Sequence, residues 1–490
     1  MGCRKMSVKE KLQQILSPEQ VVDDPEVLKE YADDHSFIPS QQPSLVVKAR
    51  DSKEVKKVIQ LANKEKFSLI PVSSGPPRFH GDTVPSREGV VILNLQDMKS
   101  IIFINRKNRV CAVEAGVTFS ELEHELEKKK LRIPMPLCPK AAKSVIASYW
   151  EREPKTLARF QWELCDPLSS CEIILGNGDT IWEGEAGYLG GSPEWQRKQG
   201  YTHKSPCGAN NMNFKKFGAS QGTLGVCTWG SIRCEVLPEL EQVLLVQDET
   251  VKNLAKIAHK LMWLRLADDI FILNALNLAS LLKRDSEDIR SLAKSLPNYV
   301  LAFTITGYGI IPEDMFAYKQ KEVENHKIPT VDSINGISSK DIQAILRKPS
   351  EEPYWKLRLK GDARDLAFQT SLAKTPEFIA EMEKLTTQAK FPTSDIGIYI
   401  QPEFQGVCCT LEFNINMAPS EAEVVKKLLQ IAGQKLFSSG AFFNRPFGEI
   451  SDLVYSHYPD SVILLNYLKE IFDPRGVMSP GKLCFKEVSQ

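Results

Sequence analysis

The first half of the chain alternates short apolar runs with amphipathic segments. Residues 44–48, Ser-Leu-Val-Val-Lys, have the composition of a strand. Asp51 stands at a helix N-cap position with Glu54 three residues later, and residues 55–61 carry an apolar stripe at helical spacing. Residues 68–72 return to strand character. The pattern predicts a parallel pair of strands joined by a helix.

More strands follow at closer spacing. Residues 90–95, 101–104 and 110–114 are apolar runs, and Thr118 then opens a helix with a glutamate at capping-box spacing. The dipeptide Asn177-Gly178 separates two further apolar runs, which predicts a tight β-hairpin. This half is therefore expected to be α+β.

After Pro238 the pattern restarts with longer elements. We expect helices near residues 248–264 and 312–326, and strands at residues 299–306, 396–401 and 407–414. Helices packed over an antiparallel sheet are the expected plan of this half.

Composition narrows the class of function. At 490 residues, the chain favours two packed domains. Its 62 basic and 62 acidic residues cancel, which argues against partners such as nucleic acid or anionic membranes and favours a small-molecule substrate. No apolar run approaches the roughly 18 residues of a membrane span, and the charged first residues do not resemble a signal peptide, so we expect a cytoplasmic protein. The eleven cysteines include no C-x-x-C pair, which favours reduced thiols over a metal site.

Three glycine-containing or proline-containing loops are the candidates for ligand binding. Residues 71–83 follow a strand and present serines, glycines and a histidine, as a pyrophosphate-binding loop does. An ordinary surface turn is the alternative, because two prolines remove backbone donors. Residues 217–226 would let a flat ring approach the backbone, or they form structural bulges. Residues 472–482 form a rigid double turn that ends in a lysine.

Taken with residues 89–95 and 114–122, these loops resemble the flavoprotein family of vanillyl-alcohol oxidase, para-cresol methylhydroxylase (PCMH) and the glycolate and D-lactate dehydrogenases. The resemblance runs from about Ser44 to Lys482. It implies an α+β fold, with a two-part PCMH-type FAD-binding domain and an antiparallel-sheet cap covered by helices. The implied division is residues 1–43, an N-terminal helical segment; residues 44–238, the FAD-binding domain; residues 239–445, the cap or substrate domain; and residues 446–490, a C-terminal return to the FAD-binding domain.

By the same resemblance, one set of residues would hold FAD. These residues are Ser73, Ser74, Gly75, Pro76, His80, Gly81, Ser144, Ala147, Ser148, Glu151, Arg152, Gly225, Val226 and Lys482. The chain departs from the family where Pro76, Pro77, Arg78 and Asp82 replace flexible positions, and Arg78 is expected to compensate with charge. Residues 355–398 contain no His, Tyr or Cys, so we expect FAD to be bound non-covalently. The histidine-rich metal motif of the D-lactate branch is absent from residues 396–414, so no metal is implied.

The substrate side is assigned from residues 439–448, which resemble the active-site segment of the vanillyl-alcohol-oxidase branch. Phe442 and Phe443 are expected to form an aromatic-sized wall together with Tyr399 of the second half. Arg445 is either an anion clamp or a surface salt-bridge residue.

The same resemblance implies the catalytic base. In that branch an acidic base sits nine residues before the glutamate that begins the strand ahead of the Asn-Gly hairpin, and counting back from Glu172 gives Glu163, with Asp166 as the next candidate. A carboxylate in an apolar pocket has a raised pKa and can take a proton as hydride leaves the neighbouring carbon. The alternative for Glu163 is a charge exposed at the edge of an apolar strand.

The resulting hypothesis is an FAD-dependent oxidoreductase that oxidises a small aromatic substrate, such as an alkylphenol or a benzylic alcohol, by hydride transfer to flavin N5. One alternative is a 2-hydroxy-acid dehydrogenase subunit of the glycolate or D-lactate type. Another is a catalytically degenerate flavin-fold subunit that acts as a scaffold or electron conduit. The sequence leaves open whether the protein has an electron-accepting protein partner and whether it forms a homo-oligomer.

Overall fold

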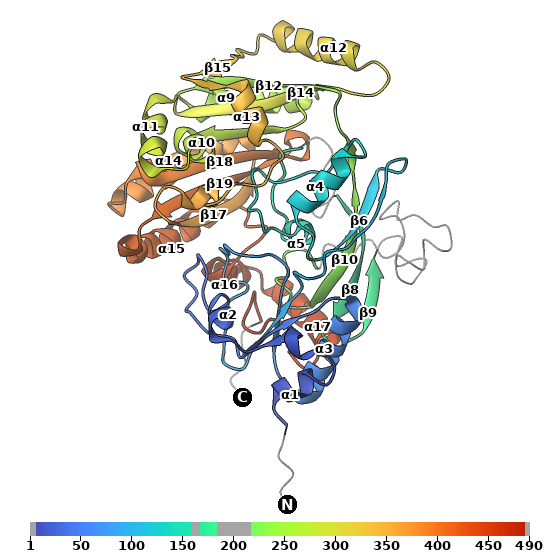
Figure 1. Cartoon of the computed structure of the whole chain (residues 1–490). Coiled ribbons are helices and arrows are strands. Elements are labelled where there is room, and N and C mark those ends of the chain that lie inside the picture. The colour runs from blue at the N-terminus through green and yellow to red at the C-terminus, as the bar shows by residue number, and fades with distance from the viewer. Residues whose placement is uncertain (1–5, 159–166, 184–216, 486–490) are drawn as a thin grey trace, which may run out of the picture.

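A computed structural model describes residues 6–158, 167–183 and 217–485 of the chain. Figure 1 shows two lobes, with the amino-terminal half below and a cap above it. The described part of the lower lobe holds a four-stranded sheet, a five-stranded sheet and a small two-stranded sheet, and the cap is built on one six-stranded sheet. The predicted α+β fold with an antiparallel-sheet cap is confirmed. Within the described ranges, no helix is long and apolar enough to cross a membrane.

The first sheet of the lower lobe has the strand order β1-β2-β4-β3. Strands β2 and β3 both pair with β4 in parallel, so the predicted helix joins two parallel strands that have β4 between them. That helix begins at the Asp51 N-cap, whose carboxylate accepts a hydrogen bond from the Glu54 N–H. The elements are α1 (Val8–Leu12), β1 (Val21–Val22), α2 (Pro25–Lys29), β2 (Leu45–Lys48), α3 (Ser52–Glu65), β3 (Leu69–Val72) and β4 (Val91–Asn94).

The second sheet is antiparallel, in the order β5-β6-β10-β8-β9. The predicted hairpin at Asn177-Gly178 joins β8 to β9, and Gly178 has a φ of 89°, which the turn requires. The predicted capping box at Thr118 is also present. The elements are β5 (Ile101–Asn105), β6 (Val110–Glu114), α4 (Phe119–Glu127), β7 (Leu131–Arg132), α5 (Val145–Trp150), β8 (Leu168–Leu175), β9 (Thr180–Glu183), β10 (Gly225–Arg233) and β11 (Glu235–Val236).

The cap sheet is antiparallel, in the order β12-β14-β13-β18-β19-β17. Its strands are β12 (Leu240–Asp248), β13 (Ile270–Asn274), β14 (Tyr299–Gly307), β17 (Asp362–Thr370), β18 (Ile396–Glu403) and β19 (Cys408–Met417). Helices α9 (Val251–Trp263), α14 (Thr375–Gln388) and α15 (Ala422–Ser438) bury one face, and α12 (Pro312–Asn325) packs on β14. Helices α10 (Ala275–Leu282), α11 (Ser286–Ser295) and α13 (Ser339–Ile345) cover part of the other face. The rest of that face is turned toward the lower lobe.

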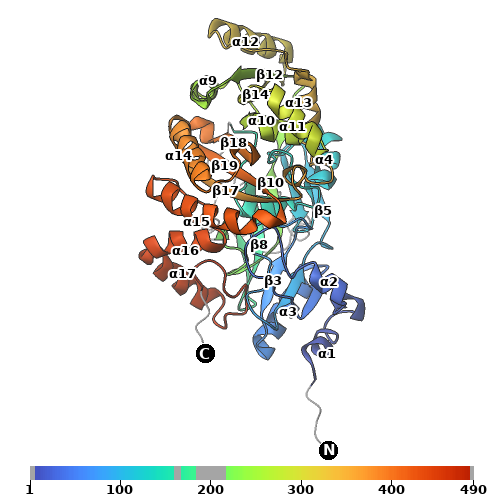
Figure 2. The ribbon, with the colours of Figure 1, turned by 90° about the vertical axis from the view of Figure 1, so that its left-hand side faces the viewer.

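The carboxyl-terminal segment returns to the lower lobe through α16 (Gly448–His457) and α17 (Pro459–Phe472), which Figure 2 shows below α15. The chain then lies along β3, where the Leu69 N–H donates to the Val477 carbonyl and the Ser479 N–H donates to the Leu69 carbonyl, each at 2.8 Å. The four-part division of the chain stays a prediction.

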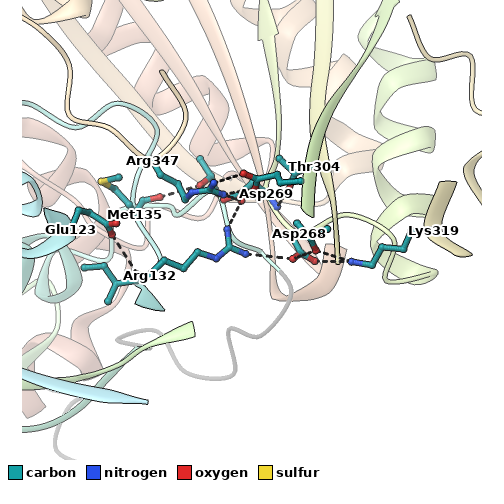
Figure 3. Close-up of polar contacts among 12 residues, drawn as sticks. Glu123, Arg132, Met135, Asp268, Asp269, Thr304, Lys319 and Arg347 are labelled. Atoms are coloured by element: carbon teal, nitrogen blue, oxygen red, sulfur yellow. Dashed lines mark hydrogen bonds and ion pairs between the residues drawn. The ribbon is translucent and has the colours of Figure 1, made fainter. Parts of the chain in front are cut away.

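A buried set of charges, the interlobe cluster, joins the two lobes (Figure 3). Arg132 on β7 reaches Asp269 at 2.9 Å and Asp268 at 3.4 Å in the cap. Arg347 also contacts Asp269, at 3.1 Å, and Lys319 contacts Asp268 at 3.4 Å. Because Arg132 is 1% exposed, these contacts are shielded from water and fix the cap to the lower lobe at this point.

Candidate functional site

A cavity of about 240 Å³, open at its mouth, lies between the lower lobe and the cap. Its walls come from both lobes, and the interface between two lobes is a common position for a ligand site. The loop after β3, helix α5 and strand β10 form the lower wall, and β17, β18 and β19 contribute to the cap wall.

The loop after β3 is held against the segment before α5. The Gly75 N–H donates to the Ala142 carbonyl at 2.9 Å, and the Ser144 N–H donates to Ser74 Oγ at 3.1 Å. Lys140 Nζ donates to the Gly75 and Pro77 carbonyls at 2.7 and 2.6 Å. These contacts leave the side of the loop that carries Ser73 and Ser74 facing the cavity.

The far end of this loop is tied to other parts of the lower lobe. The Gly81 N–H donates to Asp34 Oδ2 at 2.6 Å. Lys482 Nζ donates to the Gly81 carbonyl at 2.6 Å and to the Val84 carbonyl at 2.5 Å. Lys482 therefore positions the loop and is not itself part of the cavity wall.

Arg78 brings a buried cation to the cavity wall. Its Nη1 donates to the Glu30 carbonyl at 2.9 Å, and its guanidinium lies 4.4 Å from the centre of the Tyr31 ring. In the described part of the chain, its Nε and Nη2 have no hydrogen-bond partner, although Arg78 is only 7% exposed. A buried unpaired guanidinium is costly, and an anionic ligand group would satisfy it.

Lys140 adds a partial positive charge to this end at neutral pH. Burial, and then the charge of Lys143, lower the pKa of Lys140 to about 7. Lys143 itself is neutralised, because its Nζ lies 2.6 Å from Glu151 Oε2 and 2.9 Å from Glu153 Oε1. Arg78 and Lys140 thus fit a phosphate-bearing group at the loop, which is the group that FAD would place there.

The middle of the lower wall is made of small and apolar residues. Ala147 of α5 and Gly225 and Val226 of β10 line it. The N-cap residue of α5, Ser144, accepts from the Ala147 N–H and donates to the Ala115 carbonyl. The small side chains allow a flat ring to lie against this wall. The residues present therefore fit FAD.

The cap wall carries a second set of buried charges, the cap cluster, formed by Lys356, Asp365 and Glu412. Lys356 Nζ lies 2.6 Å from Asp365 Oδ2 and 2.5 Å from Glu412 Oε1. Asn414 Nδ2 donates to Asp365 Oδ1 and to Glu412 Oε1, each at 2.6 Å. All three charged residues line the cavity.

Strand alternation explains why these polar groups share one face. In β19, Leu411 and Phe413 point into the core beneath α14 and α15, so Glu412 and Asn414 point the other way, toward the lower lobe. Glu412 pairs with Tyr399 of β18, which also lines the cavity and donates to Gln401 Oε1 at 2.7 Å.

Arg445 stands between the two lobes after α15. It lines the cavity, and its Nη1 is buried without a hydrogen-bond partner among the described residues. Phe447 stacks on His80, with ring centres 4.1 Å apart and planes at 9°. Burial, and then the nearby charge of Arg445, hold the pKa of His80 well below its usual value, so this imidazole is neutral.

The residues predicted from the sequence divide into two sets. Those that line the cavity are Ser73, Ser74, His80, Ala147, Glu151, Gly225, Val226, Tyr399 and Arg445. Those outside its wall are Gly75, Pro76, Gly81, Ser144, Ser148, Arg152, Lys482, Phe442 and Phe443. Glu163 and Asp166 lie outside the described residues.

The predicted wall of Phe442 and Phe443 is wrong. Phe442 is 58% exposed, and its backbone forms an isolated antiparallel bridge with Gln369. Phe443 packs in the cap core, 5.5 Å from the Phe368 ring centre. The bridge to β17 directs the two side chains away from the cavity, and Tyr354, Trp355 and other aromatic residues form the wall instead.

The sequence interpretation missed Lys140, Lys143, Glu153, Lys356, Asp365, Glu412 and Phe447 as site residues. One available signal was the alternation in residues 411–415, where an acid and an amide interrupt a strongly apolar strand. Among the described residues, no group of His, Cys, Asp and Glu side chains is arranged to hold a metal ion.

Comparisons with known proteins agree with this geometry. Residues 43–184 match the model of the FAD binding domain family. The chain is 25% identical over 251 residues to a glycolate oxidase subunit of Bacillus subtilis, and the match covers 51% of the chain and 49% of that protein. It is 26% identical over 216 residues to the mitochondrial D-lactate dehydrogenase [cytochrome] of Arabidopsis thaliana, a match that covers 44% of the chain and 34% of that protein. The matches thus span half of these relatives or less.

The similarity of fold to solved structures covers more of the chain than the sequence matches do. The crystal structure of p-cresol methylhydroxylase with substrate bound superposes with a TM-score of 0.80 at 16% identity, and covers 98% of this chain and 96% of that one. Residues 43–184 therefore match an FAD-binding domain, and the chain has the fold of p-cresol methylhydroxylase.

Proposed function

We propose that the protein is an oxidoreductase that oxidises a small aromatic alcohol or alkylphenol with non-covalently bound FAD as the hydride acceptor. The observation that carries the proposal is Arg445, a cavity-lining cation whose buried Nη1 has no hydrogen-bond partner within residues 6–158, 167–183 and 217–485. A phenolate or carboxylate would satisfy this nitrogen at low cost, because Arg445 is already in place.

The cap wall supports the aromatic part of the substrate class. Tyr354, Trp355, Tyr399 and Phe447 line the same cavity as Arg445. Aromatic side chains favour stacked or edge-to-face contacts with a ring. We infer that they hold the substrate ring while Arg445 orients its anionic end.

FAD, when bound, supplies the two-electron oxidant that the amino acids lack. The chain's own residues bind and orient the reactants. Ser73, Ser74 and Arg78 hold the phosphate end, Ala147 and Gly225 leave room for the flat ring, and the cap excludes water from the substrate.

A 2-hydroxy acid is the second candidate substrate. The two curated relatives reported above are named for glycolate and D-lactate, and Arg445 would fork onto a carboxylate as well as onto a phenolate. The plant relative's name also includes a cytochrome, which favours an electron-accepting protein partner for this chain.

The test is anaerobic bleaching of the purified yellow protein by alkylphenols, benzylic alcohols and hydroxy acids. Bleaching by an aromatic substrate is the expected result, and bleaching by lactate or glycolate alone would replace the first candidate by the second. Arg445→Met should raise the half-saturating concentration at least tenfold, whereas Arg445→Lys should retain part of the affinity. A colourless protein that FAD cannot reconstitute would contradict the proposal and favour a scaffold subunit.

Acid precipitation tests how the cofactor is held. The expected result is a yellow supernatant, since FAD without a covalent bond leaves the denatured chain. A yellow pellet would contradict non-covalent binding.

A further inference from the structure

The cap cluster is more acidic than a structural ion pair needs to be. Two carboxylates and one ammonium stand on the cavity wall, with side-chain exposures of 10% for Asp365, 4% for Glu412 and 9% for Lys356. Burying ions carries a desolvation cost, and apolar residues of similar size would cover this wall more cheaply. Stability alone therefore does not account for the cluster, and its position at the cavity points to chemistry.

The two carboxyl groups differ in their affinity for a proton. Burial raises the pKa of Asp365, and the Glu412 charge adds to this against the opposite effect of Lys356. Burial acts in the same direction on Glu412, but Lys356 and the Asn414 amide outweigh it and leave the pKa of Glu412 below its ordinary value. Glu412 is thus the lasting counter-ion of Lys356, while Asp365 can exchange a proton.

The surroundings of the cluster favour this division. Tyr354 and Tyr399 face it, and Asn277 Nδ2 donates to Asn414 Oδ1 at 2.7 Å from the side away from the cavity. The Arg445 charge lowers the pKa of Glu412, so the proposed anion clamp is electrostatically close to the cluster.

Two other carboxyl groups on the lower wall are rivals for the same role. Lys143 overcomes the effect of burial and brings the pKa of Glu153 to about 2, which makes Glu153 a weak base. Burial raises the pKa of Glu151, but its charged neighbours are Lys143, Glu153 and Asp82 of the phosphate-end loop. Asp365 instead shares the cap wall with Tyr399 and Glu412, beside the aromatic residues where the substrate ring is proposed to lie.

We propose that Asp365 is the catalytic base of the site, and that Glu412 and Lys356 position and tune it; this inference rests on the proposed function. In an alcohol, the O–H bond breaks and its proton goes to the Asp365 carboxylate. The C–H hydrogen leaves with its electron pair to FAD, and the carbonyl double bond forms. The substrate thus loses two electrons and two hydrogens, one as a proton and one as a hydride. This assignment replaces Glu163 as the proposed base.

The experiment compares Asp365→Asn with a matched control, Asp362→Asn, on the same strand. Asp362 contacts His35 at 2.6 Å and lies outside the cavity wall. Both variants are assayed as holoproteins for FAD content, reduction by dithionite and the rate of flavin reduction by the best alcohol substrate. We expect Asp365→Asn to retain FAD and dithionite reduction but to slow substrate reduction at least about 100-fold. The control should stay within about threefold.

Glu412→Gln and Glu151→Gln give a readout that a purely structural role would not move. Removing the Glu412 charge should lower the pKa of Asp365, so the acidic limb of the pH–rate profile should move to lower pH. Glu151→Gln should leave that limb in place. A limb that follows Glu151, or an Asp365→Asn rate within threefold of the wild type, would overturn the assignment.

A pH titration followed by infrared spectroscopy tests Asp365 without any substrate. Glu123 and Glu151, whose pKa values burial also raises, contribute protonated-carboxyl bands to every variant, so the readout is the difference between wild type and variant. We expect a component that titrates above the ordinary range of aspartate in the difference with Asp365→Asn, and no such component in the difference with Asp362→Asn. If no alcohol reduces the wild-type flavin, the proposed function fails while this titration still decides the state of Asp365. The absence of that component from the difference between wild type and Asp365→Asn would exclude Asp365 as the exchanging group.

Discussion

The interlobe cluster and the cap cluster are both buried and ionic, but they differ in charge balance. In the interlobe cluster, Arg132 and Lys319 share Asp268, and Arg347 joins Asp269 to Glu241. With Glu241 included, three cations therefore face three carboxylates there.

The cap cluster instead sets one ammonium between two carboxylates and opens onto the cavity. A balanced cluster keeps all its charges at ordinary pH and acts as a fixed joint. A cluster with a surplus carboxylate can gain or lose a proton at little cost, which suits acid–base chemistry.

The largest expected effect on stability comes from a substitution in the interlobe cluster. Arg132→Met removes a cation shared by two buried aspartates and should lower the free energy of unfolding by about 3–5 kcal/mol. Denaturant titration of both proteins measures it. Arg132→Lys is the control, since it keeps the charge and should lose less. If Arg132→Met lowers the free energy of unfolding by less than about 1 kcal/mol, the interlobe cluster does not hold the lobes together.

Glu123 lies beside the interlobe cluster. Its titration tests whether one more negative charge there lowers the stability of the protein. Burial raises its pKa to about 7, against the opposite effects of the Ile133 N–H and Arg347. Between pH 4.5 and about 7, Glu123 is ionised in the unfolded chain but largely protonated in the folded protein. The free energy of unfolding therefore falls as pH rises through this window. Glu123→Gln should remove that fall, which amounts to about 3 kcal/mol. Parallel stability curves of the two proteins across this window would contradict it.

Much of the fold could be predicted from the sequence, because local patterns specify it. The Asp51 cap, the Thr118 capping box and the Asn177-Gly178 hairpin each depend on neighbours within a few residues, and all three are present. The insertion of β4 between β2 and β3 depends on pairing across distant segments, which periodicity does not encode.

The site was harder to predict for the same reason. Lys356, Asp365 and Glu412 are far apart in the sequence and meet only through the register of β17 with β19. Ser73, Ser74 and Gly225 could be placed because they belong to short loop and strand motifs. Phe442 was misplaced because a single backbone bridge, to Gln369, decides which way it points.

Lys356→Met tests the same comparison in the cap cluster, because it removes the cation there. The variant leaves two carboxylates together, and one of them can take a proton instead of remaining charged, so the loss should be smaller than for Arg132→Met, about 1–3 kcal/mol near neutral pH. Because the carboxyl pKa of the folded variant is raised, stability should recover as pH falls toward 5. Denaturant titrations at pH 5 and 7 measure it, and a loss that grows on acidification would contradict it.

The phosphate end of the cavity is the opposite case, with cations in excess, and here the expected effect is the smallest. Burial, and then Lys143, lower the pKa of Lys140 to about 7 in the free protein, and a bound diphosphate would favour its charged form. Above pH 7, binding must therefore take up a proton, and the affinity of the flavin-free protein for ADP should fall by up to about tenfold per pH unit, or roughly 1.4 kcal/mol. Calorimetry in buffers of different ionisation enthalpy measures both affinity and proton uptake. Lys140→Met should bind ADP more weakly at pH 6, and its affinity should not depend on pH in this way. If the variant keeps the pH dependence, the titrating group lies elsewhere. The cationic end of the cavity would then resemble the balanced interlobe cluster more than the cap cluster.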